Sequence, residues 1–430
     1  MERKMKTNLI NWKSSNNRKP LIIDGARQVG KTYIALSFGK EFYKNSVYFN
    51  FENSTELQKI FDKDLEPERI IKELAIFVGQ TILKEDTLII FDEIQACERA
   101  LTSLKYFCEN EPNYHIIAAG SLLGIALNRE KYSFPVGKVD MIKMFPLDFE
   151  EFLWALDRKD LSEAIKDHYE GNEMFNLHEI AMDYYKKYLV IGGMPRVILD
   201  YLETDDFNFV LASQKTINDS YIADMAKYAT PMETIKILNA FNTIPSQLAK
   251  ENKKFQYKLI KTGARAHEYE GPIEWLISSG IVNRCTKITE GKLPLKAYSE
   301  PSSFKLYLGD TGLLCSKLEI PANLIISGNS KFNEFRGALT ENYVCVALSS
   351  NNYSLYYLER NQNMEIDFVI QDKEGNIIPI EVKASENVRA NSLNSFIKKY
   401  NPAYSIRISG KNFGFENNIK SVPLYAAFCI

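Results

Sequence analysis

A glycine-rich segment between an apolar run and a helical pattern constrains the fold of this chain more than any other feature. Residues 20–42 read PLIIDGARQVGKTYIALSFGKEF, and residues 21–23 are continuously apolar, as in a buried parallel strand. The next part, GARQVGKT, matches G-x-x-x-x-G-K-[ST], and apolar residues then recur at helical spacing. A strand, a glycine loop and a helix in this order predict an α/β fold with a parallel sheet.

This spacing suits phosphate binding, because glycines allow backbone N–H groups to curl around phosphate oxygens. Lys31 would reach the outer phosphates, and the Thr32 hydroxyl would ligate magnesium at the start of the helix. The expected cofactors are therefore ATP and Mg²⁺. The predicted nucleotide-binding residues of this loop are Gly25, Ala26, Arg27, Gln28, Val29, Gly30, Lys31, Thr32 and Tyr33.

Two further apolar runs end in polar residues. The run TLIIFDEIQ, at residues 87–95, predicts a buried strand whose end delivers Asp92 to magnesium and Glu93 to the attacking water, which it would orient or deprotonate. The run NYHIIAAGS, at residues 113–121, predicts a third buried strand. Its last residue, Ser121, would sense the γ-phosphate or, alternatively, cap a helix.

Together with FPVGKVDMIKMFPLDFEEFL at residues 134–153, these segments resemble the AAA-type ATPase domain of a large group of prokaryotic ATP-binding proteins, the AAA_14 and DUF4143 type. The resemblance covers most of the chain and includes YLVIGGMPRVI at residues 188–198, which is similar to the family's lid helix. It implies that Pro195 contacts the adenine, with a plain loop between two helices as the alternative.

Where the family commonly has Gly-Arg, this chain has Gly137 and Lys138, and a lysine lacks the planar fork of an arginine finger. Arg129 would replace it or be a solvated helix residue.

The motifs, the expected order of elements and the resemblance together divide the chain into four predicted parts: an ATPase core at 1–150, a helical lid at 151–230, a winged-helix-like domain at 231–318 and a nuclease-like domain at 319–430. Residues 157–176 and 203–208 read as polar surface connections. From residue 231 the pattern is a helix, a short helix opened by Ser246, a longer helix ending near Gly280, and strands from Ile281, which outlines a winged helix. Residues 250–300 hold ten Lys or Arg against six Glu, which favours a DNA-facing surface, although winged helices also serve as packing modules.

The C-terminal part has the pattern α-β-β-β-α-β and resembles the core of the PD-(D/E)XK nuclease-like fold. Glu341 lies on its first helix, Asp367 on its second strand, and Glu381 and Lys383 on its third. Residues two apart on a strand share one face, and Asp367 on the neighbouring strand can project onto that face too. Asp367 and Glu381 would hold magnesium, Lys383 would position a water for attack on a phosphodiester, and Glu341 would complete the acidic set.

The alternative for this hairpin is an ordinary solvated face, because alternation alone is typical of any half-exposed strand. Against it stands Asp367, which lies between apolar neighbours in EIDFVI, whereas aspartate is depleted in strand interiors. We therefore predict the nuclease-like fold and leave open whether the domain still cleaves.

Composition bounds the partners. The formal net charge of −2 excludes a strongly basic protein, and six scattered cysteines without a CxxC pair favour the cytoplasm. No apolar stretch approaches the roughly 20 residues of a membrane span, so no membrane partner is expected.

We predict an ATP-driven switch or motor that acts on nucleic acid, most simply DNA. The alternative is an ATPase that regulates or senses a protein partner, with the other domains as scaffolds; assembly into a homo-oligomer is left open. A small-molecule kinase is disfavoured, because Glu93 beside Asp92 suits hydrolysis.

Overall fold

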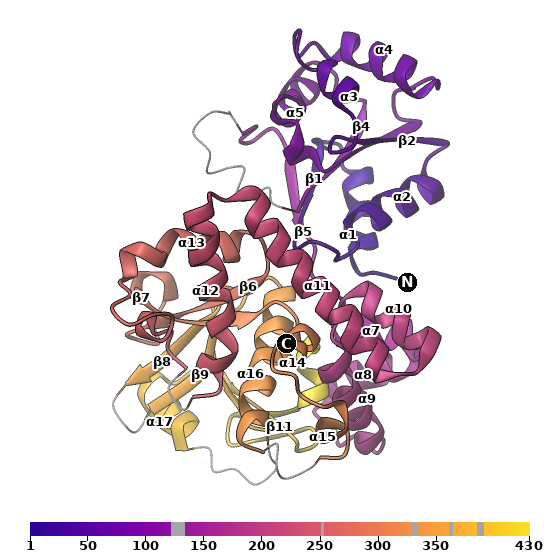
Figure 1. Cartoon of the computed structure of the whole chain (residues 1–430). Coiled ribbons are helices and arrows are strands. Elements are labelled where there is room, and N and C mark those ends of the chain that lie inside the picture. The colour runs from indigo at the N-terminus through magenta and orange to yellow at the C-terminus, as the bar shows by residue number, and fades with distance from the viewer. Residues whose placement is uncertain (122–133, 251–252, 329–332, 361–363, 385–390) are drawn as a thin grey trace. The chain divides into compact units, whose positions relative to one another are not determined.

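The computed structural model describes residues 1–121, 134–250, 253–328, 333–360, 364–384 and 391–430 (Figure 1). Within these ranges the chain forms two compact units. The N-terminal unit comprises residues 2–145 and 278–280, and the C-terminal unit comprises residues 146–277 and 281–430 together with residue 1. Each unit contains its own β-sheet.

The sheet of the N-terminal unit has five parallel strands in the order β2-β3-β4-β1-β5. Its strands are β1 (Leu21–Asp24), β2 (Asn45–Asn50), β3 (Thr87–Asp92), β4 (His115–Ala119) and β5 (Asp140–Lys143). Strand β1 lies between β4 and β5, so the glycine-rich loop that follows it starts inside the sheet and not at its edge. The parallel sheet confirms the predicted α/β fold of this part.

Helices and an aromatic core complete this unit. The helices are α1 (Met5–Ser14), α2 (Lys31–Phe42), α3 (Thr55–Lys59), α4 (Pro67–Val78) and α5 (Glu98–Asn110), with a 3₁₀ turn η1 (Ile94–Ala96) after β3. Strands β3 and β4 are buried along their whole length, which explains why both read as continuous apolar runs. Phe51, Phe61 and Phe91 pack edge to face beside β3, with ring centroids 5.3 to 6.0 Å apart.

The C-terminal unit begins with helices α7 (Phe149–Ala155), α8 (Lys159–Gly171), α9 (His178–Ile191), α10 (Pro195–Thr204) and α11 (Phe207–Tyr228). Helix α8 occupies most of residues 157–176, so the expected surface connection there is wrong. Its core residues Leu161 and Ile165 lie one turn apart and are buried, and this spacing is the signal that the polar composition obscured. The connection expected at residues 203–208 is confirmed for Asp205 and Asp206, which separate α10 from α11, whereas its other residues belong to these two helices.

Helix α12 (Pro231–Leu248) opens with a capping box between Thr230 and Glu233. It continues through Pro245 and Ser246, so the short helix expected to open at Ser246 is wrong; the Ser246 hydroxyl instead donates to the carbonyl oxygen of Thr243 inside the helix. A 3₁₀ turn η2 (Tyr257–Leu259) follows, and the expected longer helix is α13 (Ala266–Ser278). None of the helices in the described ranges combines the length and hydropathy needed to span a bilayer.

The second sheet has eight strands in the order β12-β13-β11-β10-β9-β8-β6-β7. Its strands are β6 (Val282–Ile288), β7 (Ser299–Leu308), β8 (Tyr356–Arg360), β9 (Met364–Gln371), β10 (Ile377–Val382), β11 (Ser405–Ser409), β12 (Gly414–Glu416) and β13 (Ile419–Pro423). The intervening elements are η3 (Leu295–Tyr298), α14 (Thr311–Lys317), α15 (Ala322–Ile326), α16 (Asn333–Ser350), α17 (Asn391–Tyr400) and η6 (Leu424–Cys429).

The order α16, β8, β9, β10, α17 and β11 confirms the expected sequence of elements in the C-terminal part. Strands β6 and β7, which were expected as the wing, belong to the same sheet as these strands, because β6 pairs in parallel with β8. The predicted winged-helix and nuclease-like parts therefore share one sheet. Their assignment to those two fold families, and the four-part division of the chain, stay predictions.

Candidate functional site

The glycine-rich loop joins β1 to α2 and brings the Lys31 side chain back against its own backbone. The Lys31 ammonium donates hydrogen bonds to the carbonyl oxygens of Gly25 at 2.8 Å and Ala26 at 2.7 Å. Gly25 has a φ of +147°, and a Cβ atom there would lie 2.1 Å from the carbonyl oxygen of Met144. Only glycine fits at this position, so sterics fix the start of the loop.

Lys31 is a buried cation, with 8% of its surface exposed. Burial lowers its pKa to about 8, although the nearby carboxylates of Glu93, Asp24 and Asp92 oppose the shift. A buried ammonium held mainly by two carbonyl oxygens is poised to exchange them for anionic oxygens, which would offset its desolvation better.

Asp92 ends β3 and accepts two hydroxyl hydrogen bonds on the same oxygen. Thr32 Oγ1 donates to Oδ2 at 2.9 Å, and the Tyr48 hydroxyl donates to it at 2.7 Å. Thr32 and Asp92, predicted as the two magnesium ligands, are thus in contact. Tyr48 was missed by sequence reasoning, because its strand β2 carries no motif and only the pairing of β2 with β3 brings it to this edge of the sheet.

Glu93, the predicted base, follows directly and has a φ of 50°, which is unusual for a residue with a side chain. Its carboxylate accepts a hydrogen bond from the Gln95 side chain. Burial raises the pKa of Glu93, and the neighbouring charge of Asp92 adds to this effect, while Gln95 and Lys31 oppose it. A strained backbone and a raised carboxyl pKa at one residue are typical of functional sites.

The other predicted residues of the loop differ in burial. Ala26 and Val29 are buried, Gln28 has a φ of 67°, and Tyr33 is 57% exposed. Ser121 is buried two residues after the end of β4, and its role as a γ-phosphate sensor stays a prediction. Lys138 forms an ion pair with Glu109 at 2.9 Å, which gives it a partner inside its own unit.

Two predicted residues lie elsewhere. Pro195 is the first residue of α10 and belongs to the C-terminal unit, so its contact with the adenine stays a prediction. Arg129, the alternative to Lys138, lies outside the described residues.

The four residues predicted as the C-terminal site form part of one buried charge cluster. Asp367 on β9 is 8% exposed and Glu381 on β10 is 3% exposed, so this face of the hairpin is not solvated. Asp367 Oδ2 accepts a hydrogen bond from the backbone N–H of Val382 at 2.8 Å, and the Lys383 ammonium lies 3.4 Å from Glu381 Oε1. Glu341 on α16 is also buried.

Two lysines that sequence reasoning missed complete the cluster. Lys253 forms an ion pair with Glu341, and the Tyr307 hydroxyl donates to the second oxygen of Glu341 at 3.2 Å. Lys305 on β7 is 2% exposed and is attracted by both Glu341 and Asp367. The sequence carried one signal for Lys305, since a lysine within the apolar strand SSFKLYL is as unusual as the aspartate in EIDFVI.

The pKa shifts show how these charges balance. Burial and the Glu341 charge raise the pKa of Asp367 well above its usual range. Burial acts to raise the pKa of Glu341 as well, but Lys253 and Lys305 outweigh it and hold that pKa low. Burial acts to lower the pKa of Lys305, but Glu341 and Asp367 outweigh it and raise that pKa. The opposite charges of Glu341 and Lys305 thus stabilise each other's ionised form, while Lys305 itself forms an ion pair with Glu365 at 3.7 Å.

Comparison with known families agrees with the geometry of the N-terminal unit. Residues 17–153 match the family AAA_14, described as an AAA domain. The chain contains an AAA-type P-loop ATPase domain. Residues 182–324 match DUF8612 and residues 336–427 match DUF4143, both described as domains of unknown function. The comparison with curated proteins found no match.

Solved structures similar to the chain include ATPases. The Walker-type ATPase PABY2304 of Pyrococcus abyssi aligns with 74% of this chain and 95% of its own, at 15% identity and a TM-score of 0.45. The ORC2 protein of Aeropyrum pernix aligns with 76% of this chain and 92% of its own, at 12% identity and a TM-score of 0.36. ORC1 of the same organism, solved in complex with DNA, aligns with 76% of this chain and 91% of its own, at 12% identity and a TM-score of 0.32. At these TM-scores, the assignment of the AAA domain rests on its family match and strand order.

The AAA domain fits magnesium through the Thr32 hydroxyl and the Asp92 carboxylate, both oxygen donors that are already in contact. In the described ranges no three or more His, Cys, Asp or Glu residues are grouped as metal ligands. This agrees with an ion that uses one or two protein oxygens together with nucleotide phosphates. In the C-terminal cluster, Glu341 is paired with Lys253 and Glu381 with Lys383, whereas the buried Glu381 Oε2 has no hydrogen-bond partner among the described residues. The magnesium assignment of Asp367 and Glu381 stays a prediction.

We expect the AAA domain to bind ATP more weakly above about pH 8. The Lys31 pKa of about 8 means that raising the pH further removes the charge that faces the phosphates. The charged fraction of the ligand-free protein falls about tenfold per pH unit in that range. Calorimetric titration with ATP and magnesium between about pH 7.5 and 9.5 measures the effect, because the γ-phosphate, with a pKa of about 6, is already ionised there. Lys31→Arg serves as the control, since arginine keeps its charge; an equal pH dependence in both proteins would contradict the assignment.

Replacing Lys305 by methionine is expected to lower the free energy of unfolding by about 3 kcal/mol near pH 8, because it leaves Glu341 and Asp367 buried with one fewer partner. The raised pKa of Asp367 gives the sign of the pH dependence. Because Asp367 binds its proton more tightly in the folded than in the unfolded state, the folded protein gains stability as the pH falls. The unfolding free energy lost through Lys305→Met should therefore be smaller near pH 5 than near pH 8. Urea unfolding measures it, with Lys292→Met as the exposed control. Equal stability of both variants at pH 8 would show that Lys305 does not neutralise the cluster.

Proposed function

We propose that the protein is an ATP-hydrolysing switch that acts on nucleic acid. The observation that carries the ATPase part is the convergence of Lys31, Thr32, Asp92 and Glu93 at the loop between β1 and α2. Lys31 binds the outer phosphates, and Thr32 and Asp92 hold the magnesium ion, which neutralises charge on the phosphate oxygens when bound. Glu93 orients the attacking water and accepts its proton, and Gln95 positions the Glu93 carboxylate.

Nucleic acid is the proposed partner because the positive charges of residues 250–300 fall into two groups. Lys253, Arg284 and Lys287 lie near acidic partners inside the C-terminal unit. Lys254 is half-buried, and the exposed cations of this segment are Lys250, Lys258, Lys261, Arg265, Lys292 and Lys296. Such cations are suited to phosphate contacts, which supply most of non-specific nucleic-acid binding.

For the C-terminal cluster we propose a structural role without metal-dependent cleavage. The support is the ion pairs of Glu341 with Lys253 and of Glu381 with Lys383, together with the attraction between Glu341 and Lys305. Plasmid DNA incubated with the full chain and Mg²⁺ or Mn²⁺ should therefore stay supercoiled. Nicking by the wild-type protein that is lost in Asp367→Asn would instead establish the nuclease.

The test of the proposed function is the ATP hydrolysis rate with and without DNA, together with the salt dependence of DNA binding. DNA should raise the rate, and the logarithm of the binding constant should fall linearly with the logarithm of salt concentration. An unchanged rate and the absence of salt-sensitive binding would overturn the nucleic-acid part. ATP hydrolysis that responds to a protein partner alone would then establish the alternative switch.

A further inference from the structure

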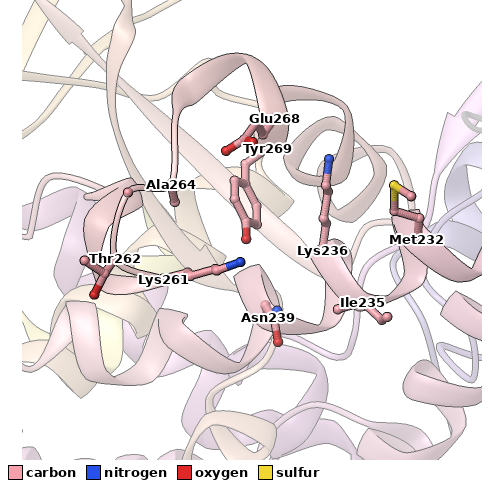
Figure 2. Close-up of a pocket in the computed structure, with 10 residues that line it drawn as sticks. Met232, Ile235, Lys236, Asn239, Lys261, Thr262, Ala264, Glu268 and Tyr269 are labelled. Carbon is pink, nitrogen blue, oxygen red and sulfur yellow. The ribbon is translucent and has the colours of Figure 1, made fainter.

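A pocket of about 260 Å³ lies between α12, the loop at residues 261–264 and the first turn of α13 (Figure 2). Its lining includes two lysines, Lys236 from α12 and Lys261 from the loop. Its volume is below the roughly 300 to 1,000 Å³ of sites that enclose a whole small molecule. The pocket therefore suits a single charged group.

Several groups around Lys261 can donate hydrogen bonds. Figure 2 shows the Lys261 and Tyr269 side chains pointing toward each other, and Asn239 also lines the pocket. Tyr269 is only 4% exposed, and its hydroxyl makes no hydrogen bond with any residue that the structure describes. This hydroxyl faces the pocket beside the lysine ammonium groups, so a ligand with several acceptor oxygens would fit these donors.

The loop and helix beside these groups add to the preference for an anion. Gly263 has a φ of +81°, and a Cβ atom there would meet no heavy atom within 4 Å, so a ligand can approach the backbone closely. Helix α13 has 13 residues and begins at Ala266, next to Ala264 in the pocket wall, and the positive end of its dipole faces this side.

One carboxylate, that of Glu268, also lines the pocket. It accepts a hydrogen bond from the backbone N–H of Arg265 at 3.0 Å, and this bond is the main cause that lowers the pKa of Glu268. His267 and Lys236 lower it further. The pocket thus carries two ammonium groups against one carboxylate that is already engaged, and its net charge is positive.

We propose that this pocket binds a phosphate group of a nucleic-acid backbone, an inference that rests on the proposed action on nucleic acid. Phosphate offers acceptor oxygens to the Lys236 and Lys261 ammonium groups, to the Tyr269 hydroxyl and to the Asn239 amide. The apolar side chains of Met232 and Ile235 are 71% and 60% exposed at the pocket wall. They give the sugars next to that phosphate an uncharged surface.

The test compares DNA binding by the full chain and by the double variant Lys236→Ala, Lys261→Ala, using the fluorescence anisotropy of a labelled duplex. The variant should bind about tenfold more weakly at low salt, and its salt slope should be smaller by about 2, one unit for each lost lysine contact. The double variant Lys215→Ala, Lys373→Ala removes the same charge from exposed positions outside the pocket and outside residues 250–300, and it should keep most of the affinity. Urea unfolding shows that both double variants are folded.

Two further arms separate the outcomes. Glu268→Gln should tighten DNA binding by about two- to threefold, because it removes the one carboxylate that lines the pocket among the described residues. Inorganic phosphate should compete with DNA for the wild-type protein and not for the lysine double variant.

If the wild type binds no DNA, the proposed function fails together with this inference. If the wild type binds DNA and both double variants match it, the inference alone fails. Phosphate binding that depends on the two lysines, with DNA affinity unchanged, would make the pocket a site for free phosphate and overturn the backbone assignment.

Discussion

Replacing Lys31 by alanine should lower kcat/KM for ATP by about 10²- to 10³-fold, the cost of removing one preorganised electrostatic contact from an active site. The Lys31 ammonium is buried and already donates to two loop carbonyls, so it needs little rearrangement to meet the phosphates. Alanine leaves the loop without its only lysine, and no water-exposed side chain can supply the charge equally well.

The matched control is Lys40→Ala, which removes an exposed lysine from the last turn of the same helix, α2. It should leave ATP turnover unchanged. Thermal unfolding of both variants distinguishes lost catalysis from lost folding. Normal hydrolysis by a folded Lys31→Ala protein would refute the assignment of the phosphate site.

Replacing Glu93 by glutamine should lower the rate of ATP hydrolysis by about 10²- to 10⁴-fold while ATP binding is retained, as expected for the loss of a general base. Glutamine keeps the shape of the side chain but cannot accept a proton from water. The raised pKa of Glu93 adds a pH signature. The wild-type rate should fall as the pH drops through that pKa, because only the carboxylate acts as a base, and the residual rate of the variant should lack this acid limb.

The control for this variant is Glu68→Gln, at an exposed position in the first turn of α4 in the same unit. Rates and ATP affinities of the three proteins are measured as the pH is lowered from neutral, because the pKa of Glu93 is raised. Glu93 would lose its assigned role if Glu93→Gln hydrolysed ATP at the wild-type rate, or if the acid limb persisted in this variant.

The local part of the nucleotide site was predictable from sequence, because its chemistry is contiguous. Gly25, Lys31 and Thr32 lie within eight residues, and steric demands at Gly25 leave only glycine. Asp92 and Glu93 follow an apolar run that reads as a buried strand wherever it lies in the sheet. The predicted meeting of Thr32 with Asp92 depends only on two parallel strands ending at the same edge.

The residues that sequence reasoning missed depend on tertiary pairing. Tyr48 reaches Asp92 because β2 is the neighbour of β3, and nothing in NSVYFN specifies that neighbour. Lys305 reaches Glu341 and Asp367 from β7, a strand that was assigned to a separate domain. The hairpin with Asp367 and Glu381 could therefore be recognised, but its neutralisation by lysines from other elements could not.

The most direct test of the central claim, a nucleotide-driven switch on nucleic acid, is the DNA affinity of Glu93→Gln in the presence of ATP and of ADP. This variant should hold ATP without turnover, so each nucleotide state can be measured at equilibrium. If nucleotide and nucleic acid are coupled, their effects are reciprocal, and the two dissociation constants should differ by at least about fivefold. Equal DNA affinity in the two nucleotide states would contradict the switch.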